Sequence, residues 1–97
     1  MKMHMKEVGV NELKGKVGEG SEAPLRVGAT ADPNRRAGEY KQKYPEDATM
    51  NYAKTSNMKS AENKLLDKCN EREGCPRNSH SRSNAPATPG YVYAIFP

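Results

Sequence analysis

Hydrophobic and polar positions divide the chain into short apolar segments separated by long polar ones. Residues 25–30 and 48–54 have the apolar spacing of half-buried strands, and residues 90–96 are the most strand-like stretch of all. Residues 33–44 and 58–69 place apolar side chains at helical spacing. The order strand, helix, strand, helix, loop, strand predicts a small α/β or α+β domain, and we favour the α+β class. We expect a mainly antiparallel sheet of about three strands, flanked by two or more helices.

The remaining two segments lack such patterns. Residues 1–24 contain glycines among scattered charges, which predicts a flexible arm or a partly ordered segment, with one short element around residues 8–13. Residues 70–89 are rich in Asn, Ser, Arg, Pro and Gly and contain almost nothing apolar, which predicts a long loop. The sequence therefore predicts a single domain over residues 25–97, preceded by the arm.

The helix over residues 33–44 has a strong start signal and two early arginines. Asp32 can cap the free amide groups, and Pro33 has no amide hydrogen to lose. Arg35 and Arg36 then fall in the first turn, where the helix dipole disfavours cations. A bound phosphate would offset this cost, whereas two solvated surface arginines are the alternative.

Composition narrows the classes of partner. The chain has 97 residues, is 34% hydrophobic and carries a net charge of +4, which favours polyanionic partners such as nucleic acid and leaves a protein partner open. No apolar run approaches the roughly 20 residues needed to cross a bilayer, so no membrane partner is expected. We expect a soluble protein and favour an intracellular location, with a removed signal peptide as the alternative.

Cysteine usage adds one candidate cross-link. Cys69 and Cys75 lie six residues apart at the end of the second predicted helix and could close a short disulfide loop. Two cysteines are too few to indicate an oxidising compartment, and a structural zinc site is not expected. A small secreted protein held together by this disulfide is one of the functional alternatives.

Glu62 is the acidic residue that fits its surroundings least. On the helix over residues 58–69 it falls in the same sector as Met58, Leu65 and Cys69. A carboxylate in an apolar sector is costly unless it is paired, protonated or bound to a metal. Three interpretations stay open: a functional carboxylate, a structural salt bridge with an arginine such as Arg36, and simple exposure at the rim.

Tyrosines and loop residues supply further candidates. Tyr91 and Tyr93 share a face of the last strand, either as a packed aromatic pair or with one hydroxyl aimed into a cleft. The polar residues of the long loop could contact a phosphate or a metal-bound water, or could simply be solvated; they are Arg77, Asn78, His80 and Arg82. No Ser-His-Asp, Cys-His, P-loop or dinucleotide-binding pattern is present, so acyl transfer and P-loop hydrolysis are not expected.

Four short sequence features follow one another along the chain. They are Val27-Gly28, Arg36 eight residues later, Glu62 within Ala61-Glu62-x-x-Leu65-Leu66, and the final Gly90-Tyr91-Val92-Tyr93-Ala94-Ile95. Over residues 25–96 this set resembles the GIY-YIG nuclease domain. In that family the GIY strand comes first and pairs with the YIG strand, whereas the GIY-like strand comes last here. A circular permutation reconciles the two orders, and it predicts antiparallel pairing of residues 90–95 with 25–30.

The resemblance implies a metal-dependent endonuclease, a hydrolase that cleaves DNA or RNA. Glu62 would be the ligand of one Mg²⁺ or Mn²⁺ ion, Arg36 would stabilise the phosphate, and Tyr93 or else Tyr91 would activate water. Asn78 would match the late Asn of the family. The side chains expected to hold the nucleic acid are Arg26, Arg35, Arg77, Asn78, His80 and Arg82.

One departure from the family pattern supports a different interpretation. Arg26 stands where the second motif usually has Tyr, although some relatives carry a basic residue there. A domain that has lost catalysis and serves as a nucleic-acid or protein-binding module is therefore the alternative.

Overall fold

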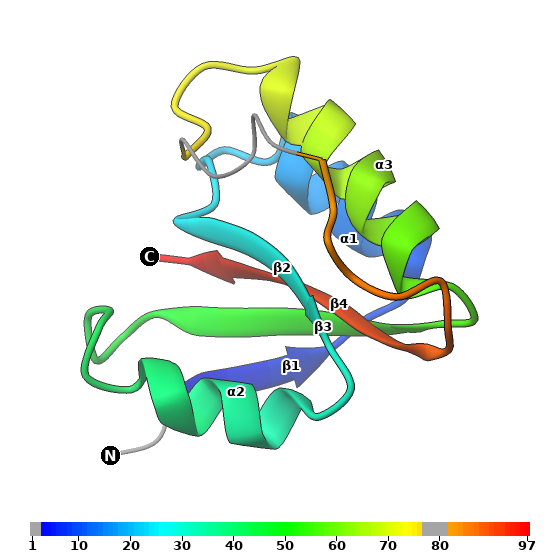
Figure 1. Ribbon diagram of the computed structural model, residues 1–97. Coiled ribbons are helices and arrows are strands. Elements are labelled where there is room, and N and C mark those ends of the chain that lie inside the picture. Colours follow the sequence, from blue (N-terminus) through cyan, green and yellow to red (C-terminus); the bar gives the residue numbers. More distant parts are fainter. Residues whose placement is uncertain (1–2, 77–81) are drawn as a thin grey trace.

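A four-stranded mixed sheet forms the centre of the structure, a computed structural model that describes residues 3–76 and 82–97 (Figure 1). Its strands are β1 (His4–Glu7), β2 (Arg26–Thr30), β3 (Thr49–Thr55) and β4 (Gly90–Phe96). Their order across the sheet is β1-β3-β4-β2. The β1 strand is parallel to β3, and the other two pairings are antiparallel. The α+β class is therefore confirmed, with four strands where about three were expected.

The predicted pairing of the last strand with the first apolar segment is confirmed. Arg26 lies opposite Ile95, and Thr30 lies opposite Tyr91, in an antiparallel register. Across the rest of the sheet, His4 and Phe96 both lie opposite Thr49, on its two sides. With strands about 5 Å apart, the start of β1 and the end of β4 are about 10 Å from each other.

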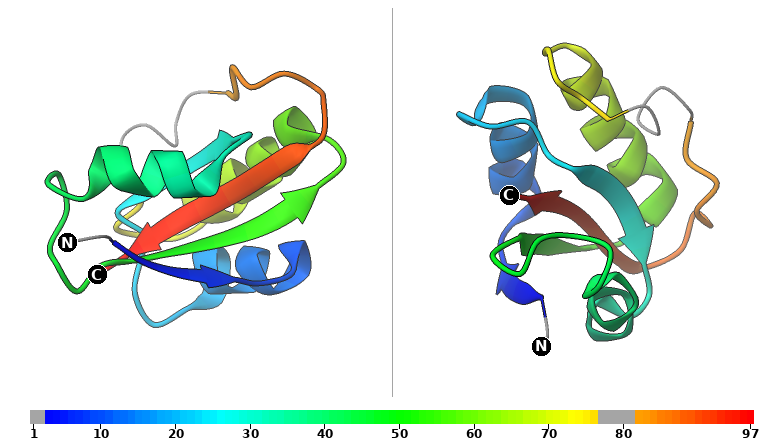
Figure 2. Two further views of the ribbon diagram at one scale, coloured as in Figure 1. Left: turned by 90° about the horizontal axis from the view of Figure 1, so that it is seen from below. Right: turned by 90° about the vertical axis from the view of Figure 1, so that its left-hand side faces the viewer.

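Helices cover both faces of the sheet (Figure 2). The α1 helix (Val10–Glu19) and the α3 helix (Met58–Asn70) lie on one face, and α2 (Pro33–Tyr40) lies on the other. The core under α1 and α3 includes Leu13, Val17, Val27, Ala53, Ala61, Leu65, Leu66, Cys69, Val92 and Ala94. The core under α2 includes Met3, Ala37, Tyr40, Ala48, Met50, Tyr93 and Ile95. Successive residues of β4 thus alternate between the two cores, as the pleat of a central strand requires.

The N-terminal segment is ordered, which agrees with the alternative of a partly ordered segment and not with that of a flexible arm. Residues 4–7 form β1, and residues 10–19 form α1, which buries Leu13 and Val17 fully. A Cβ atom on Gly18 would lie 3.3 Å from the Cβ of Lys68, so glycine at this position lets α1 approach α3 closely. Three of the four β1 residues are exposed, which explains why no alternating pattern marks this strand.

The α2 helix begins as predicted and ends early. The Asp32 carboxylate accepts a hydrogen bond from the Arg35 amide at 3.1 Å, and Pro33 occupies the first helical position. The prediction that the helix continues to Tyr44 is wrong, because the helix ends at Tyr40. The amides of Lys43 and Tyr44 both donate to the Tyr40 carbonyl, and the exposed residues 41–43 offer no apolar side chain that would hold a further turn on the sheet.

The α3 helix carries the cross-link. Its first turn is capped by Asn57, whose side chain accepts from the Ser60 amide at 3.0 Å. Cys69 and Cys75 form a disulfide with Cα atoms 5.6 Å apart, and this ties the end of α3 to the segment that follows it. Within residues 3–76 and 82–97, no helix combines the length and the apolar character needed to span a membrane.

Candidate functional site

A cleft of about 520 Å³ lies along the β2 edge of the sheet. It is lined by Arg26, Val27, Gly28, Ala29, Arg36, Glu62, Leu66, Arg82, Ser83, Asn84, Ala85 and Tyr93. Among these are Arg36 from α2, Glu62 from α3 and Tyr93 from β4, which are three of the residues that the sequence singled out. The fold therefore brings together side chains that are up to 67 positions apart in the chain, those of Arg26 and Tyr93.

The position of β2 explains how residues from both faces of the sheet meet. Arg36 belongs to the helix on one face, and Glu62 belongs to a helix on the other face. Because β2 is an edge strand, the cleft can extend around it. Gly28 lies directly opposite Tyr93, and a Cβ atom on Gly28 would come within 2.5 Å of the Tyr93 Cζ atom. Only glycine at this position leaves room for the tyrosine ring.

Arg36 is held at the side of the cleft by two neighbours on its own helix. Its Nε atom is 3.3 Å from Oε1 of Glu39, and its Nη1 donates to the Tyr40 hydroxyl at 3.5 Å. The hydrogen bond to Tyr40 outweighs the effect of burial and raises the pKa of Arg36. The Arg36 side chain is 36% exposed. Its guanidinium is held by Glu39 and Tyr40 and still faces the cleft.

Tyr40 and Tyr93 form a buried hydroxyl pair. Their oxygens are 3.1 Å apart, and the rings are 8% and 1% exposed. Burial opposes ionisation of Tyr40, but hydrogen bonds from Tyr93 and Arg36, together with the charge of Arg26, lower its pKa. Burial and the hydrogen bond to Tyr40 raise the pKa of Tyr93 well above the ordinary value. Tyr40 is thus the member of the pair that ionises first.

Arg26 adds a second positive charge to the cleft. Its guanidinium carbon lies 5.2 Å from the centre of the Tyr40 ring, within the range of a cation–π contact. Its Nε atom is buried and has no hydrogen-bond partner among the described residues. Burial disfavours the charge, but the oxygens of Tyr44, Tyr40 and Tyr93 outweigh it and raise the pKa of Arg26. Arg26 therefore makes this end of the cleft electropositive.

Glu62 is half-buried, and its Oε1 atom accepts a hydrogen bond from the Ser83 hydroxyl. Within the described residues the ion pair of Arg36 is with Glu39, so the structure does not show a salt bridge between Arg36 and Glu62. Those residues contain no group of three or more His, Cys, Asp or Glu able to hold a metal. A single carboxylate fits Mg²⁺, which keeps most of its waters, and does not fit a metal that needs a full set of protein ligands.

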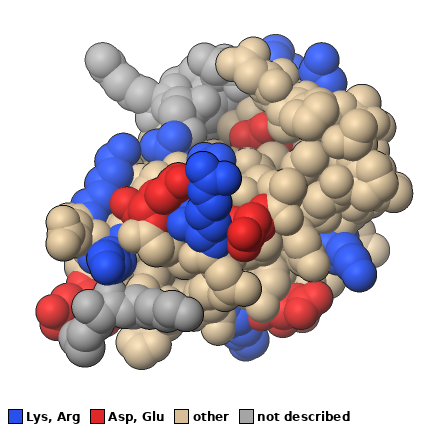
Figure 3. Space-filling model, turned by 60° about the horizontal axis from the view of Figure 1, so that its bottom comes forward, with Lys and Arg blue, Asp and Glu red and all other residues tan. Residues whose placement is uncertain are grey.

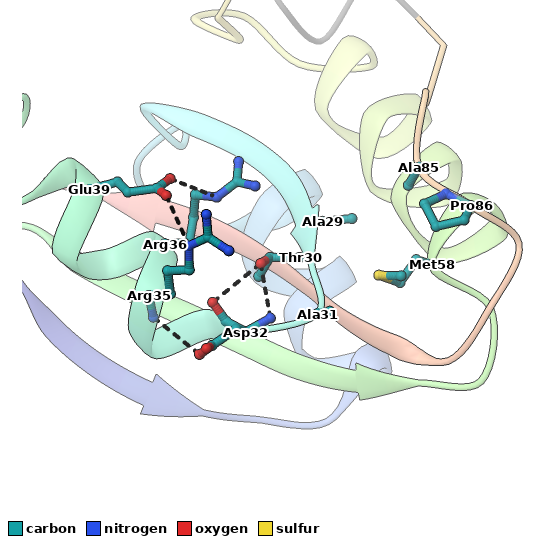
Figure 4. A pocket seen from close by; sticks show the side chains of 10 residues that line it. All are labelled: Ala29, Thr30, Ala31, Asp32, Arg35, Arg36, Glu39, Met58, Ala85 and Pro86. Atoms are coloured by element: carbon teal, nitrogen blue, oxygen red, sulfur yellow. Dashed lines mark hydrogen bonds and ion pairs between the residues drawn. The ribbon is translucent and has the colours of Figure 1, made fainter.

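The two arginines of α2 have different surroundings. Figure 4 shows a smaller pocket of about 360 Å³ beside the cleft, lined on one side by Thr30, Asp32 and the two arginines. Both arginines reach Glu39, but the Arg35 side chain is 79% exposed and does not line the larger cleft. Arg36 is therefore the arginine that the fold directs into the site.

The other predicted residues are placed in three ways. Arg82 lines the cleft and pairs with Asp67 at 2.6 Å. Tyr91 packs against Tyr52 with ring centres 5.9 Å apart, and it does not line the cleft. The loop candidates Arg77, Asn78 and His80 lie outside the described residues.

Two residues of the site were missed by the sequence analysis. Tyr40 follows Arg36 by one helical turn, and this spacing places the two on one helix face, so a signal was present. Ser83 had no such signal, because its contact with Glu62 joins a loop to a helix 21 residues earlier.

Surface charge does not form a single positive patch on the face turned toward the viewer in Figure 3, where Lys and Arg alternate with Asp and Glu. Comparison with protein families, with characterised proteins and with solved structures finds no match for this chain. The proposed function therefore rests on the geometry of the cleft.

Proposed function

We propose that the protein is a metal-dependent endonuclease-like domain that hydrolyses nucleic-acid phosphodiesters in the cleft at the β2 edge. The observation that carries this proposal is the meeting of Arg36, Glu62 and Tyr93 in one cleft, from three different elements. The antiparallel pairing of β2 with β4 supports a circularly permuted GIY-YIG-like arrangement, since the two motif-bearing strands are neighbours.

Charge on the phosphate is the main barrier to this reaction. In the proposal, Arg36 and Arg26 contact the non-bridging oxygens and offset the charge that grows in the transition state. Glu62 would hold a Mg²⁺ or Mn²⁺ ion, which supplies Lewis-acid stabilisation of the same charge. Arg36 is suited to this role because its contacts with Glu39 and Tyr40 already hold the guanidinium in place.

A proton must leave the attacking water, and the tyrosine pair supports a route for it. Tyr93 lines the cleft, and its hydroxyl lies 3.1 Å from that of Tyr40. In the proposal, the water passes a proton to the Tyr93 oxygen while Tyr93 passes its own proton to the ionised Tyr40 oxygen. Tyr40 is the member of the pair that can start as the anion and so take up the proton, because hydrogen bonds from Tyr93 and Arg36 and the charge of Arg26 lower its pKa.

Cleavage of plasmid and oligonucleotide DNA and RNA with Mg²⁺ or Mn²⁺ tests the proposal. We expect Glu62→Gln and Arg36→Ala to lower the cleavage rate by about 10²–10³-fold, which is the typical effect of removing one transition-state contact. Glu46→Gln and Lys41→Ala make the same charge changes at exposed positions outside the cleft and should cleave like the parent. Equal cleavage by all five proteins would end the proposal.

The alternative is a binding module without catalysis, which the presence of Arg26 in place of a tyrosine favours. The same experiment separates the two functions. Tight binding of nucleic acid by the parent, with no cleavage in either metal, would select the binding module.

Tyrosinate absorbance tests the proton relay through pH. Because Arg36, Arg26 and Tyr93 lower the pKa of Tyr40, the first tyrosine should ionise below the ordinary value of about 10 as the pH rises. Tyr40→Phe should remove this first step, and Tyr52→Phe should keep it. A titration curve that is the same in Tyr40→Phe and the parent would contradict the assignment.

A further inference from the structure

The strongest unassigned feature of the cleft is a serine that contacts its carboxylate. Ser83 is 7% exposed, and its hydroxyl donates to Oε1 of Glu62. The Ala85 amide donates to the same hydroxyl oxygen at 3.0 Å. A carboxylate can only accept hydrogen bonds, and the amide can only donate, so the single proton of the Ser83 hydroxyl must point at Glu62.

The position of Ser83 is itself fixed from α3. Its backbone amide donates to Oδ1 of Asn63, the residue next to Glu62, at 2.8 Å. On one side, Arg82 pairs with Asp67. On the other side, the carbonyls of Pro86 and Thr88 accept from the first amides of α3, those of Lys59 and Met58, at 3.3 and 2.9 Å. The segment 82–88 is therefore bound along the same helix that carries Glu62.

The hydrogen bond from Ser83 satisfies a buried hydroxyl and also holds one oxygen of a carboxylate at the cleft. A buried hydroxyl needs hydrogen-bond partners, and Ser83 uses its one donor on Glu62 although that carboxylate could take its hydrogen bonds from water at the cleft. Within the described residues, the Oε2 atom of Glu62 takes no hydrogen bond. One oxygen is held and the other has no partner among residues 3–76 and 82–97, an arrangement in which an outer hydrogen bond can orient a metal-binding carboxylate.

We infer that Ser83 is a positioning residue that orients the Glu62 carboxylate toward a divalent cation in the cleft. This inference rests on the proposed function, in which Glu62 is the metal ligand. Ser83 touches neither the nucleic acid nor the reacting atoms in this role, and it acts only through Glu62.

Binding of Mn²⁺ to the full chain, followed by the electron paramagnetic resonance signal of the free ion, tests the inference without cleavage. Ser83→Ala should weaken Mn²⁺ binding by about 10-fold or more, as loss of an outer partner of a metal ligand typically does. Ser83→Thr keeps a hydroxyl and should restore most of the affinity. Ser60→Ala removes an exposed hydroxyl from the same helix and should bind like the parent.

The dependence of cleavage on Mg²⁺ concentration gives the second measurement. Ser83→Ala should need about 10-fold more Mg²⁺ for half-maximal cleavage and should approach the parent rate at saturation. A purely structural role would instead lower the melting temperature and the saturated rate in parallel, and this pattern would overturn the inference.

The outcomes separate the inference from the proposed function. Equal Mn²⁺ affinity and equal Mg²⁺ dependence in Ser83→Ala and the parent, with Glu62→Gln still impaired, would overturn the inference alone. A parent protein that cleaves nothing but binds Mn²⁺ through Glu62 and Ser83 would refute the nuclease and support the positioning role. No Mn²⁺ binding by the parent would refute the positioning role.

Discussion

At the scale of single residues, the cleft depends on exact pairs of neighbours across the sheet and along α2. Gly28 and Tyr93 face each other across β2 and β4, and the absence of a side chain at one makes room for the ring of the other. The Tyr93 hydroxyl then reaches Tyr40, which in turn reaches Arg36. A change at one of these positions should therefore be transmitted to the next.

Gly28→Ala tests this dependence. The new methyl group would collide with the Tyr93 ring, so we expect the free energy of unfolding to fall by about 1–3 kcal/mol, as for other overpacked cores. Gly38→Ala is the matched control, because a Cβ there meets nothing within 4 Å and alanine favours helix. It should raise the free energy of unfolding by up to ~1 kcal/mol. Denaturant unfolding of the two variants measures both, and equal stability would contradict the packing argument.

At the scale of elements, the disulfide and the loop around Ser83 are both attached to α3. The disulfide ties Cys75 to the last turn of the helix, and residues 82–88 run back along it toward its first turn. The helix thus organises both described ends of the long polar segment, while its inner face packs on the sheet. Stability and site geometry are linked through this one element.

Reduction of the disulfide should destabilise the protein modestly. For a loop of this short length, the loss of cross-linking entropy corresponds to about 2 kcal/mol of unfolding free energy. Denaturant unfolding with and without reductant measures it, and Cys75→Ser should reproduce the reduced value. Mass spectrometry of the purified protein reports whether the cross-link is present. A fully reduced pair under oxidising conditions would count against a secreted, disulfide-stabilised protein.

At the scale of the whole molecule, charge and topology act together. On the face shown in Figure 3, Lys and Arg alternate with Asp and Glu, so the net charge of +4 forms no single positive patch there. Three arginines line the cleft, and of these Arg36 pairs with Glu39 and Arg82 pairs with Asp67. We therefore expect nucleic acid to bind through a few phosphate contacts at the cleft rather than over a broad basic surface.

Salt dependence tests this view of binding. The affinity of Glu62→Gln, which should cleave DNA far more slowly than the parent, for duplex DNA should fall linearly on a plot of log affinity against log salt concentration. Arg82→Ala should reduce the slope by about 0.9, the value expected for one lost phosphate contact, whereas Lys41→Ala should leave it unchanged. A flat salt response in the parent would indicate a protein partner.

How much of this protein could be predicted depends on the range of the interactions involved. Local signals predicted two of the helices and three of the strands, because caps such as Asp32 and alternating apolar residues act within a few positions. The sequence analysis did not predict the α1 helix, because its glycines weaken the local signal and its stability comes from packing on α3. The sequence analysis did not predict the β1 strand, because its backbone pairs with β3 while most of its side chains are exposed.

The sequence by itself determined three candidate residues that meet in the cleft. Arg36, Glu62 and Tyr93 were recognisable because each is unusual for its local position or fits a short motif. Only the tertiary structure decided how they are arranged: that β2 is an edge, that Tyr40 ionises before Tyr93, and that Ser83 holds Glu62. The physical reason is that burial, hydrogen bonding and pKa depend on contacts between segments far apart in the chain, and no local pattern records those contacts.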